Sequence, residues 1–222
     1  MKIVSYNINA CTQHKVDHLF KMGADVYVVP EIAREDKIFL SEDFEMKWAG
    51  DESFPSKGLG LLWRKGRGEV PLWYDKGLHY AVPVIFDGIL ILGIWPTKID
   101  KKETYTQIAK TIIDCYSENI KESKCIVTGD FNLYHKDGKN NKDADLLPIN
   151  ELLESLGLAS VYHKQKGITL GQEFEATYFH RYKKDDAFFL DYSYSNFPVA
   201  KYELLDWDKD ISDHVGQSIQ TG

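Results

Sequence analysis

Two polar side chains, Asp130 and Asn132, follow a short apolar run in the middle of the chain. Residues 125–127 are largely β-branched and Gly129 closes the run, which predicts a buried strand that ends there. Because side chains two residues apart in a strand point the same way, the carboxylate and the amide would face the same space. A carboxylate can take a proton from water while an amide holds an oxyanion. The pattern indicates a hydrolytic site, although an Asx-rich turn has the same signature.

The same arrangement recurs near the start of the chain. A strand is expected at residues 3–6, followed on one face by two polar residues, Asn7 and Asn9. A second strand is expected at residues 25–30, whose nearly continuous apolar run is typical of a strand covered on both faces. The proline at its end is expected to stop it, which leaves Glu31 at the strand end. Taken alone, Glu31 would be interpreted as a solvated loop residue.

A carboxylate in an apolar setting near the C-terminus needs a partner. Strands are expected at residues 176–179 and 187–194, and the second carries Asp191 among apolar neighbours. An ionised carboxylate is costly to bury unless another group pairs with it. Asp213 and His214 lie side by side near the end of the chain, and the imidazole can serve as that partner.

Between these motifs the chain alternates helices and strands. Apolar stripes and capping residues predict helices at residues 12–22, 103–120 and 146–156. A run of strands between residues 48 and 95, with a hairpin signal at residues 87–88, favours an antiparallel region. Periodicity alone predicts a protein of mixed α and β structure.

Composition limits the class of protein further. With 222 residues, 43% hydrophobic content and no linker or repeat, we expect one domain at residues 1–222. The net charge of −7 argues against a surface that wraps duplex nucleic acid, but it is compatible with a local basic patch.

The sequence gives no signal for export or membrane insertion. Its N-terminus lacks the layout of a signal peptide, and its longest apolar stretch, residues 89–95, is too short to span a bilayer. The cysteines Cys11, Cys115 and Cys125 show no metal-type spacing, so buried reduced thiols are expected. We therefore expect a cytoplasmic protein that does not bind membranes, and no obligate protein partner is evident.

Taken together and in order, these motifs resemble the endonuclease/exonuclease/phosphatase family of exonuclease III and DNase I-like enzymes. The resemblance spans nearly the whole chain. It rests on Asn7, Glu31, the Gly-Asp-Phe-Asn run at 129–132, the Leu-Asp-Tyr run at 190–192 and the Ser-Asp-His run at 212–214. It implies a four-layer α/β sandwich, in which two mixed β-sheets pack face to face with flanking helices.

The resemblance also implies roles for the acidic residues. Glu31 would hold a divalent metal, Mg²⁺ or Mn²⁺, with Asp213 helping directly or through water and Asn9 beside it. Asp130 would orient or deprotonate the attacking water. Hard carboxylate oxygens suit both ions, so these assignments are chemically consistent.

The remaining roles concern the phosphate. By resemblance, Asn7 and Asn132 would position the phosphate and the nucleophile. His214, oriented by Asp191, would bind a non-bridging phosphate oxygen. An aspartate behind a histidine fixes its tautomer and favours its charged form, which suits a group that neutralises a developing negative charge.

One position departs from the family pattern. Family members usually have His or Tyr at the end of the strand that here finishes at Trp95, and an indole N–H can donate a hydrogen bond but cannot transfer a proton. Trp95 is equally interpretable as a phosphate contact or as a buried core residue. The candidates for substrate binding are Trp95, Lys136, Tyr178 and Arg181.

Basic residues in two loops favour a nuclease over the other activities of the family. They are Lys136, Lys139 and Lys142 after the proposed site, and Arg181, Lys183 and Lys184 before Asp191. The leading expectation is a phosphodiester hydrolase that cuts DNA or RNA to leave a 3′-hydroxyl and a 5′-phosphate. The alternatives are a phosphatase or phosphodiesterase for a small phosphoester, and a catalytically silent module that binds nucleic acid.

Overall fold

The computed structural model describes residues 1–78, 80–98, 102–136 and 143–222. Two mixed six-stranded sheets form its centre, the first in the order β13-β14-β1-β2-β4-β3 and the second in the order β5-β6-β7-β8-β12-β9. The strands of the first sheet are β1 (Lys2–Ser5), β2 (Val26–Ile32), β3 (Phe44–Gly50), β4 (Gly58–Arg64), β13 (Lys201–Leu204) and β14 (Gln217–Gln220). Those of the second are β5 (Gly68–Glu69), β6 (Ala81–Phe86), β7 (Ile89–Ile94), β8 (Cys125–Asp130), β9 (Ala159–Ser160) and β12 (Asp191–Ser195).

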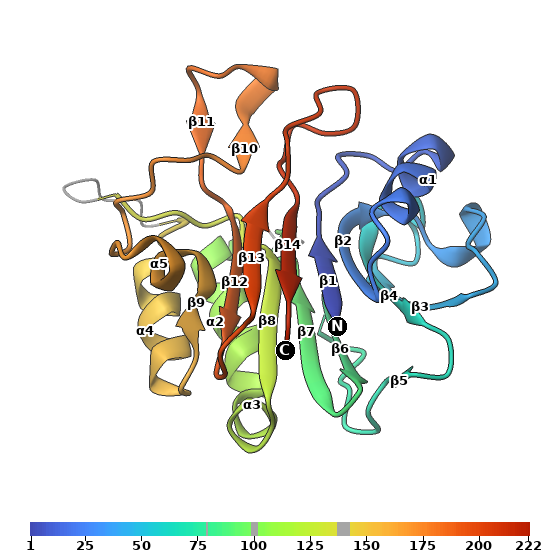
Figure 1. The fold of residues 1–222 in the computed structure, drawn as a ribbon, viewed down its shortest axis with the longest axis horizontal. Helices are drawn as coiled ribbons and strands as arrows, with labels where there is room; N and C mark the ends of the chain where they lie inside the picture. Colours follow the sequence, from blue (N-terminus) through green and yellow to red (C-terminus); the bar gives the residue numbers. More distant parts are fainter. Residues whose placement is uncertain (79, 99–101, 137–142) are drawn as a thin grey trace.

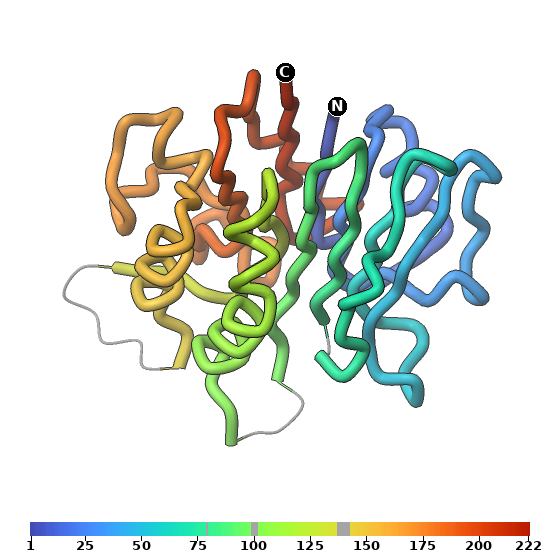
Figure 2. Tube along the Cα trace, turned by 90° about the horizontal axis from the view of Figure 1, so that it is seen from below, coloured from blue at the N-terminus to red at the C-terminus, as the bar shows by residue number. Residues whose placement is uncertain are grey.

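Helices cover the outer face of each sheet. Helix α1 (Gln13–Lys21) lies on the first sheet, and α2 (Tyr105–Cys115), α3 (Ser117–Glu122) and α4 (Leu147–Ser155) lie on the second (Figures 1 and 2). Helix α5 (Val161–Lys166) contacts β9, β12 and β13. The two short strands β10 (Tyr178–Phe179) and β11 (Ala187–Phe188) form a separate hairpin. The expected four-layer α/β sandwich of two mixed sheets is confirmed.

Alternating side chains explain the layers. Strands β1 and β2 are apolar on both faces because one face meets the second sheet and the other meets α1. The side chains that face the second sheet are Ile3, Val26 and Val28. Those that pack with Val16 and Leu19 of α1 are Val4, Tyr27 and Val29. The antiparallel pairing of β1 with β14 brings the two ends of the chain side by side, as both figures show.

The predicted strand at residues 25–30 was too short, and its proline does not end it. Strand β2 continues to Ile32, with a register shift against β4 between Pro30 and Ile32. A proline has no N–H for the ladder and is tolerated at such a bulge. Glu31 is the extra residue, with a φ of 65°. The bulge therefore takes Glu31 out of the ladder and re-aims its side chain.

The predicted helix at residues 103–120 is two helices. Thr104 caps α2 through a capping box with Gln107. Tyr116 then leaves the helical region, with φ −102° and ψ 10°, and its buried ring lies 5.6 Å from that of Trp73. A tertiary contact thus accompanies a break that the 3.6-residue periodicity does not reveal.

The cysteine prediction was correct only in part. All three cysteines are free, but Cys115 is exposed on α2 and Cys11 is half-buried, whereas Cys125 is buried in β8. In the part of the chain that the structure describes, the helices are too short or too polar to cross a membrane.

Candidate active site

The ends of several strands meet at the upper edge of both sheets in Figure 1. In the second sheet, β8 ends at Asp130 directly opposite Asp191, the first residue of β12. In the first sheet, Asn7 follows β1 closely, and β2 runs parallel to β1 toward Glu31. The fold thus brings together residues that are far apart in the sequence.

Gly129 allows β8 to lie against β7 just before the site. Its φ is 153°, and a Cβ at this position would lie only 1.9 Å from the backbone oxygen of Ile94. No other residue fits this approach without moving the strand. The next turn is also unusual, because Asn132 has a φ of 53°. Asparagine adopts the left-handed region more readily than most residues, which explains its place there.

Asp130 is held by two amides. The side-chain amide of Asn7 donates to Oδ2 of Asp130 at 2.9 Å, and the backbone N–H of Asn132 donates to Oδ1 at 2.9 Å. The side-chain amide of Asn132 donates in turn to the carbonyl of Pro96 at 2.9 Å. The carboxylate is 2% exposed, so its orientation is fixed within the site.

His214 is held from two sides. Its Nδ1 lies 2.9 Å from Oδ2 of Asp191, and its Nε2 lies 3.9 Å from Oδ2 of Asp130. The hydroxyl of Ser212 donates to the carbonyl of Asn7 at 2.6 Å and accepts the backbone N–H of His214 at 3.0 Å. The loop that carries the histidine is therefore tied to the end of β1.

Burial and charge shift the pKa values of this pair. Burial raises the pKa of Asp130, and the charge of Asp191 adds to the rise, while His214 and Asn7 oppose it. Burial alone would lower the pKa of His214, but the charges of Asp191 and Asp130 outweigh it and raise the pKa to about 9. The histidine is thus cationic near neutral pH, beside a carboxylate that takes a proton more readily than usual.

A second group of carboxylates lies toward solvent. Oε2 of Glu31 accepts the backbone N–H of Ala10 at 3.1 Å and lies 3.1 Å from Nζ of Lys57. Oδ1 of Asp213 is buried without a hydrogen-bond partner among the described residues. Burial raises the pKa of Asp213, and the nearby charge of Glu31 is among the further causes.

Two sets of residues have the donor chemistry for a divalent cation. One ligand atom each from Asp130, Asp191 and His214 lie within 4.8 Å of one another. The other set is Glu31 and Asp213, whose unpartnered buried oxygen is the kind of atom that a cation satisfies. The hydrogen bonds that already hold the first set make the second the better fit for an oxygen-preferring ion.

The other predicted residues lie around this centre. The ring of Tyr178 is 4.7 Å from that of His214. The side-chain amide of Asn9 donates to the hydroxyl of Tyr182 at 2.9 Å, so only its carbonyl oxygen is left as a ligand atom. Arg181, in the left-handed region with a φ of 53°, is exposed on the β10–β11 hairpin.

Trp95 and Lys136 differ in burial. Trp95 is 4% exposed and belongs to the main core, yet Lys57 lies over its ring. Lys136 is exposed beside an aromatic pocket lined by Tyr134 and Phe188. The predicted Lys139 and Lys142 lie outside the described residues.

Sequence reasoning missed several residues that support the site. Lys15 of α1 donates to the backbone carbonyls of Ile8 at 2.7 Å and Asn9 at 2.5 Å, and holds the loop after β1. The hydroxyl of Thr177 accepts the backbone N–H of Asp191 at 3.0 Å. Nothing in the local pattern marks these residues. Lys57 lies within the run of strands predicted between residues 48 and 95, and it too carries no motif.

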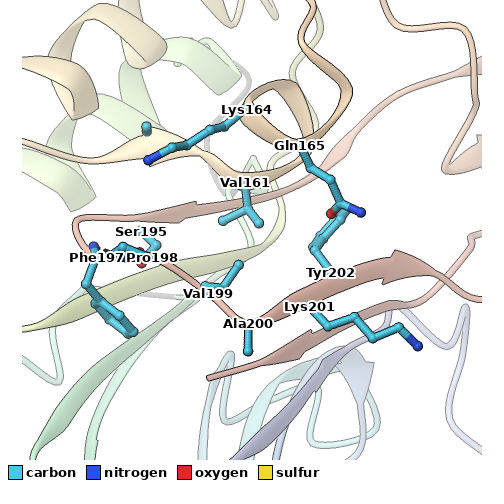
Figure 3. A pocket seen from close by; sticks show the side chains of 11 residues that line it. Val161, Lys164, Gln165, Ser195, Phe197, Pro198, Val199, Ala200, Lys201 and Tyr202 are labelled. Atoms are coloured by element: carbon cyan, nitrogen blue, oxygen red, sulfur yellow. Dashed lines mark hydrogen bonds between the residues drawn. The ribbon is translucent and has the colours of Figure 1, made fainter. Parts of the chain in front are cut away.

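A cavity of about 340 Å³ lies elsewhere. Val161, Val199 and Tyr202 are among its lining residues, with Lys164 and Lys201 at its rim (Figure 3). It also includes Ser195, at the opposite end of β12 from Asp191. It contains none of the predicted site residues.

No protein-family model matches the sequence, and no curated protein matches it. Solved structures do match. The 3′ phosphatase NExo from Neisseria, bound to a product DNA hairpin, has a TM-score of 0.76 at 15% identity, with 100% of this chain and 99% of that chain covered. An AP endonuclease from Archaeoglobus fulgidus has a TM-score of 0.74 at 16% identity, with coverage of 100% and 99%. The catalytic domain of APE2 from Xenopus laevis has a TM-score of 0.71 at 15% identity, with coverage of 99% and 91%. The chain therefore has the fold of these proteins.

Proposed function

We propose that this protein is a divalent-metal-dependent phosphodiester hydrolase, most directly a nuclease that acts on DNA or RNA. The observation that carries the proposal is the buried constellation of Asp130, His214 and Asp191, in which a carboxylate and a cationic imidazole face each other across 3.9 Å. The shared fold supports it, because the structures that match include a 3′ phosphatase and an AP endonuclease.

In the proposed reaction Asp130 accepts a proton from the attacking water. Its raised pKa suits a group that must take a proton near neutral pH. Asn7 and Asn132 hold its two oxygens, so little reorganisation is needed during the reaction. His214 donates a hydrogen bond to a non-bridging phosphate oxygen and stabilises the charge that builds there.

Asp191 acts through His214. It accepts the Nδ1–H and thereby points Nε2 toward the site and favours the charged imidazole. Ser212 fixes the loop, so the position of the imidazole does not depend on the substrate. These residues form a preorganised site for negative charge.

Glu31 and Asp213 would hold Mg²⁺ or Mn²⁺, with the carbonyl oxygen of Asn9 as a further ligand. When bound, such an ion supplies Lewis-acid stabilisation of the phosphate. The support from this chain is chemical: the charge of Glu31 contributes to the raised pKa of Asp213, and Asp213 has a buried oxygen without a partner among the described residues.

A nucleic-acid substrate is supported by a neighbour whose structure holds a DNA hairpin and by exposed basic residues near the site, Lys136 and Arg181. The ring of Tyr178, which lies 4.7 Å from that of His214, would contact the substrate beside the phosphate. A small phosphoester is the second candidate. The net charge of −7 favours it, since an acidic protein attracts polyanions weakly.

The test is a substrate panel with Mg²⁺, Mn²⁺ or a chelator. It compares single-stranded DNA, duplex DNA, RNA, an aryl phosphodiester and an aryl phosphomonoester, using the wild-type protein and the Asp130→Asn variant. The expected result is cleavage of a nucleic acid that requires metal and is lost in the variant. Tight nucleic-acid binding without any turnover would instead support a silent binding module, and turnover of the monoester alone would support a phosphatase.

A further inference from the structure

Lys57 lies at the mouth of the proposed site although its sequence position carries no motif. It precedes β4, whose first residue, Gly58, pairs with Ile32. The bulge at Glu31 lies beside that pair, so the lysine and the glutamate emerge from neighbouring strands at the same edge. Nζ of Lys57 lies 3.1 Å from Oε2 of Glu31, and the lysine side chain is 50% exposed while that of Glu31 is 16% exposed.

The ring of Trp95 lies under the same ammonium group. The distance from Nζ of Lys57 to the ring centroid is 5.4 Å, within the range of a cation–π contact. Trp95 itself is fixed, because its backbone N–H donates to the carbonyl of Tyr80 at 2.8 Å and the two rings meet edge to face at 4.9 Å. A buried aromatic ring on one sheet thus supports a lysine from the other.

Trp95 is also joined to the catalytic side of the site. The carbonyl of the next residue, Pro96, accepts the side-chain amide of Asn132, whose backbone N–H holds Asp130. The ammonium of Lys57 therefore lies beside both the carboxylate of Glu31 and the ring of Trp95, whose neighbour Pro96 is hydrogen-bonded to Asn132. A phosphate bound by His214 and Asn132 would lie in this neighbourhood.

A second lysine near the site shows what a purely structural role looks like. Nζ of Lys15 donates to two backbone carbonyls, those of Ile8 and Asn9. These bonds hold the loop that follows β1. Lys57 instead meets a carboxylate and an aromatic face at a half-exposed position, an arrangement that leaves N–H donors for an anion.

We propose that Lys57 is a phosphate-binding residue of this site, with its ammonium placed by Trp95 against an oxygen of the scissile phosphodiester. The proposal rests on the proposed function and adds a specific residue to it. Lys57 and His214 then both bind the phosphate, one a half-exposed cation and one a buried cation. Trp95 is a positioning residue. This role explains why Trp95 is buried in the core and yet lies next to the proposed site.

Under this proposal Glu31 interacts with both Lys57 and the divalent cation. A cation that binds Glu31 competes with Lys57 for the same carboxylate oxygen. Removal of the lysine charge is therefore expected to tighten Mg²⁺ binding in the absence of substrate. A lysine that only neutralised Glu31 would show this effect and no other.

The test separates these two roles by measuring binding without turnover. In the Asp130→Asn background, the affinity for a short single-stranded DNA is measured at several salt concentrations with Mg²⁺ present. Lys57→Met is expected to weaken binding about tenfold and to reduce the slope of log K against log salt by about 0.7, the signature of one lost phosphate contact on a single strand. Lys57→Arg is expected to keep most of the affinity and the full slope.

Lys65→Met is the matched control. Lys65 is exposed just beyond the far end of β4, about 26 Å along the strand from Lys57, so its loss is expected to leave the affinity and the slope unchanged. Mg²⁺ affinity without DNA is measured for the same variants by calorimetry, and thermal unfolding verifies that each variant is folded. Lys57→Gln replaces Lys57→Met if the latter fails to fold.

The proposal is overturned if Lys57→Met tightens Mg²⁺ binding but leaves DNA affinity and salt slope unchanged. Failure of the proposed function is distinguishable from this outcome. If the proposed function is wrong, the Asp130→Asn protein would not bind DNA at all, or the wild-type protein would cleave no phosphodiester, whatever residue stood at position 57.

Discussion

The two sides of the candidate site differ in how completely their polar groups are satisfied. On the inner side, Asp130, Asp191 and His214 are at most 5% exposed and hydrogen-bonded to one another or to fixed amides. On the outer side, Glu31 has a half-exposed lysine as its ionic partner, and Asp213 has a buried oxygen with no hydrogen-bond partner among the described residues.

This difference indicates a division of labour. A side whose donors and acceptors are already matched is preorganised, and it can act on a proton and on developing charge with little movement. A side with two carboxylates that feel each other's charge and an oxygen without a hydrogen bond is completed by a cation. Substitutions on the inner side are therefore expected to lower turnover, and substitutions on the outer side to lower Mg²⁺ affinity.

The largest expected effect comes from the inner side. His214→Ala removes the cation that stabilises the phosphate charge, and turnover is expected to fall by about two to three orders of magnitude. His14→Ala removes an exposed histidine of α1 and serves as the control. Steady-state rates at saturating metal measure both. A His214→Ala protein that kept near wild-type turnover would remove this residue from the catalytic set.

The next effect is on stability and depends on pH. The pKa of His214 is raised to about 9 in the folded protein, above its usual value of about 6.5. The folded state therefore binds the proton more tightly, and this stabilisation is complete below pH about 6.5 and lost as the pH rises to about 9. The loss amounts to about 3 kcal/mol at 1.36 kcal/mol per pH unit.

Denaturant unfolding of the chelator-treated protein between pH 6 and 9.5, roughly the titration range of such a group, measures this loss. The raised pKa of Asp130 acts in the same direction at lower pH. His214→Gln is expected to flatten the upper part of the profile. If the free energy of unfolding of His214→Gln fell as steeply with pH, the titrating group would be another residue.

A smaller effect is expected on the outer side. Glu31→Gln removes one anionic ligand, so Mg²⁺ affinity is expected to fall about tenfold or more, and turnover is expected to recover in part at raised Mg²⁺. Glu35→Gln, an exposed residue of the short helix at Glu35–Lys37, is the control. A metal requirement that did not change would take Glu31 out of the ligand set.

The smallest effect is expected at Trp95, where the two sides meet. Trp95→Tyr removes part of a large ring that belongs to the core, and the free energy of unfolding is expected to fall by about 1 kcal/mol or more. Turnover per folded molecule is expected to hold, since a tyrosine ring still supports Lys57. A large loss of turnover without a loss of stability would show that the indole itself contacts the substrate.

The inner side was more predictable from the sequence than the outer side. Asp130 and Asn132 stand two residues apart at the end of a short apolar run, and Asp191 is a carboxylate among apolar neighbours that needs a partner, so local pattern and simple electrostatics located them. The family resemblance supplied the sandwich of two mixed sheets, which periodicity did not reveal.

The positions of the remaining site residues depend on contacts between segments that are far apart in the sequence. Glu31 lies on a bulge, and its strand continues beyond Pro30 because β4 provides a partner that the local pattern does not reveal. Lys57 and Trp95 adjoin strands of different sheets, β4 and β7, and a contact between two such segments leaves no period in either strand. The break at Tyr116 has the same origin in tertiary packing.

The division of labour between the two sides is tested most directly by Mg²⁺ calorimetry on the Asp130→Asn variant, compared with its turnover. The account predicts that turnover is lost while Mg²⁺ affinity stays within a few-fold of wild type, because Asp130 belongs to the inner side and the ion to Glu31 and Asp213. A parallel loss of Mg²⁺ binding would contradict it. That result would place the ion among Asp130, Asp191 and His214, whose ligand atoms lie within 4.8 Å of one another.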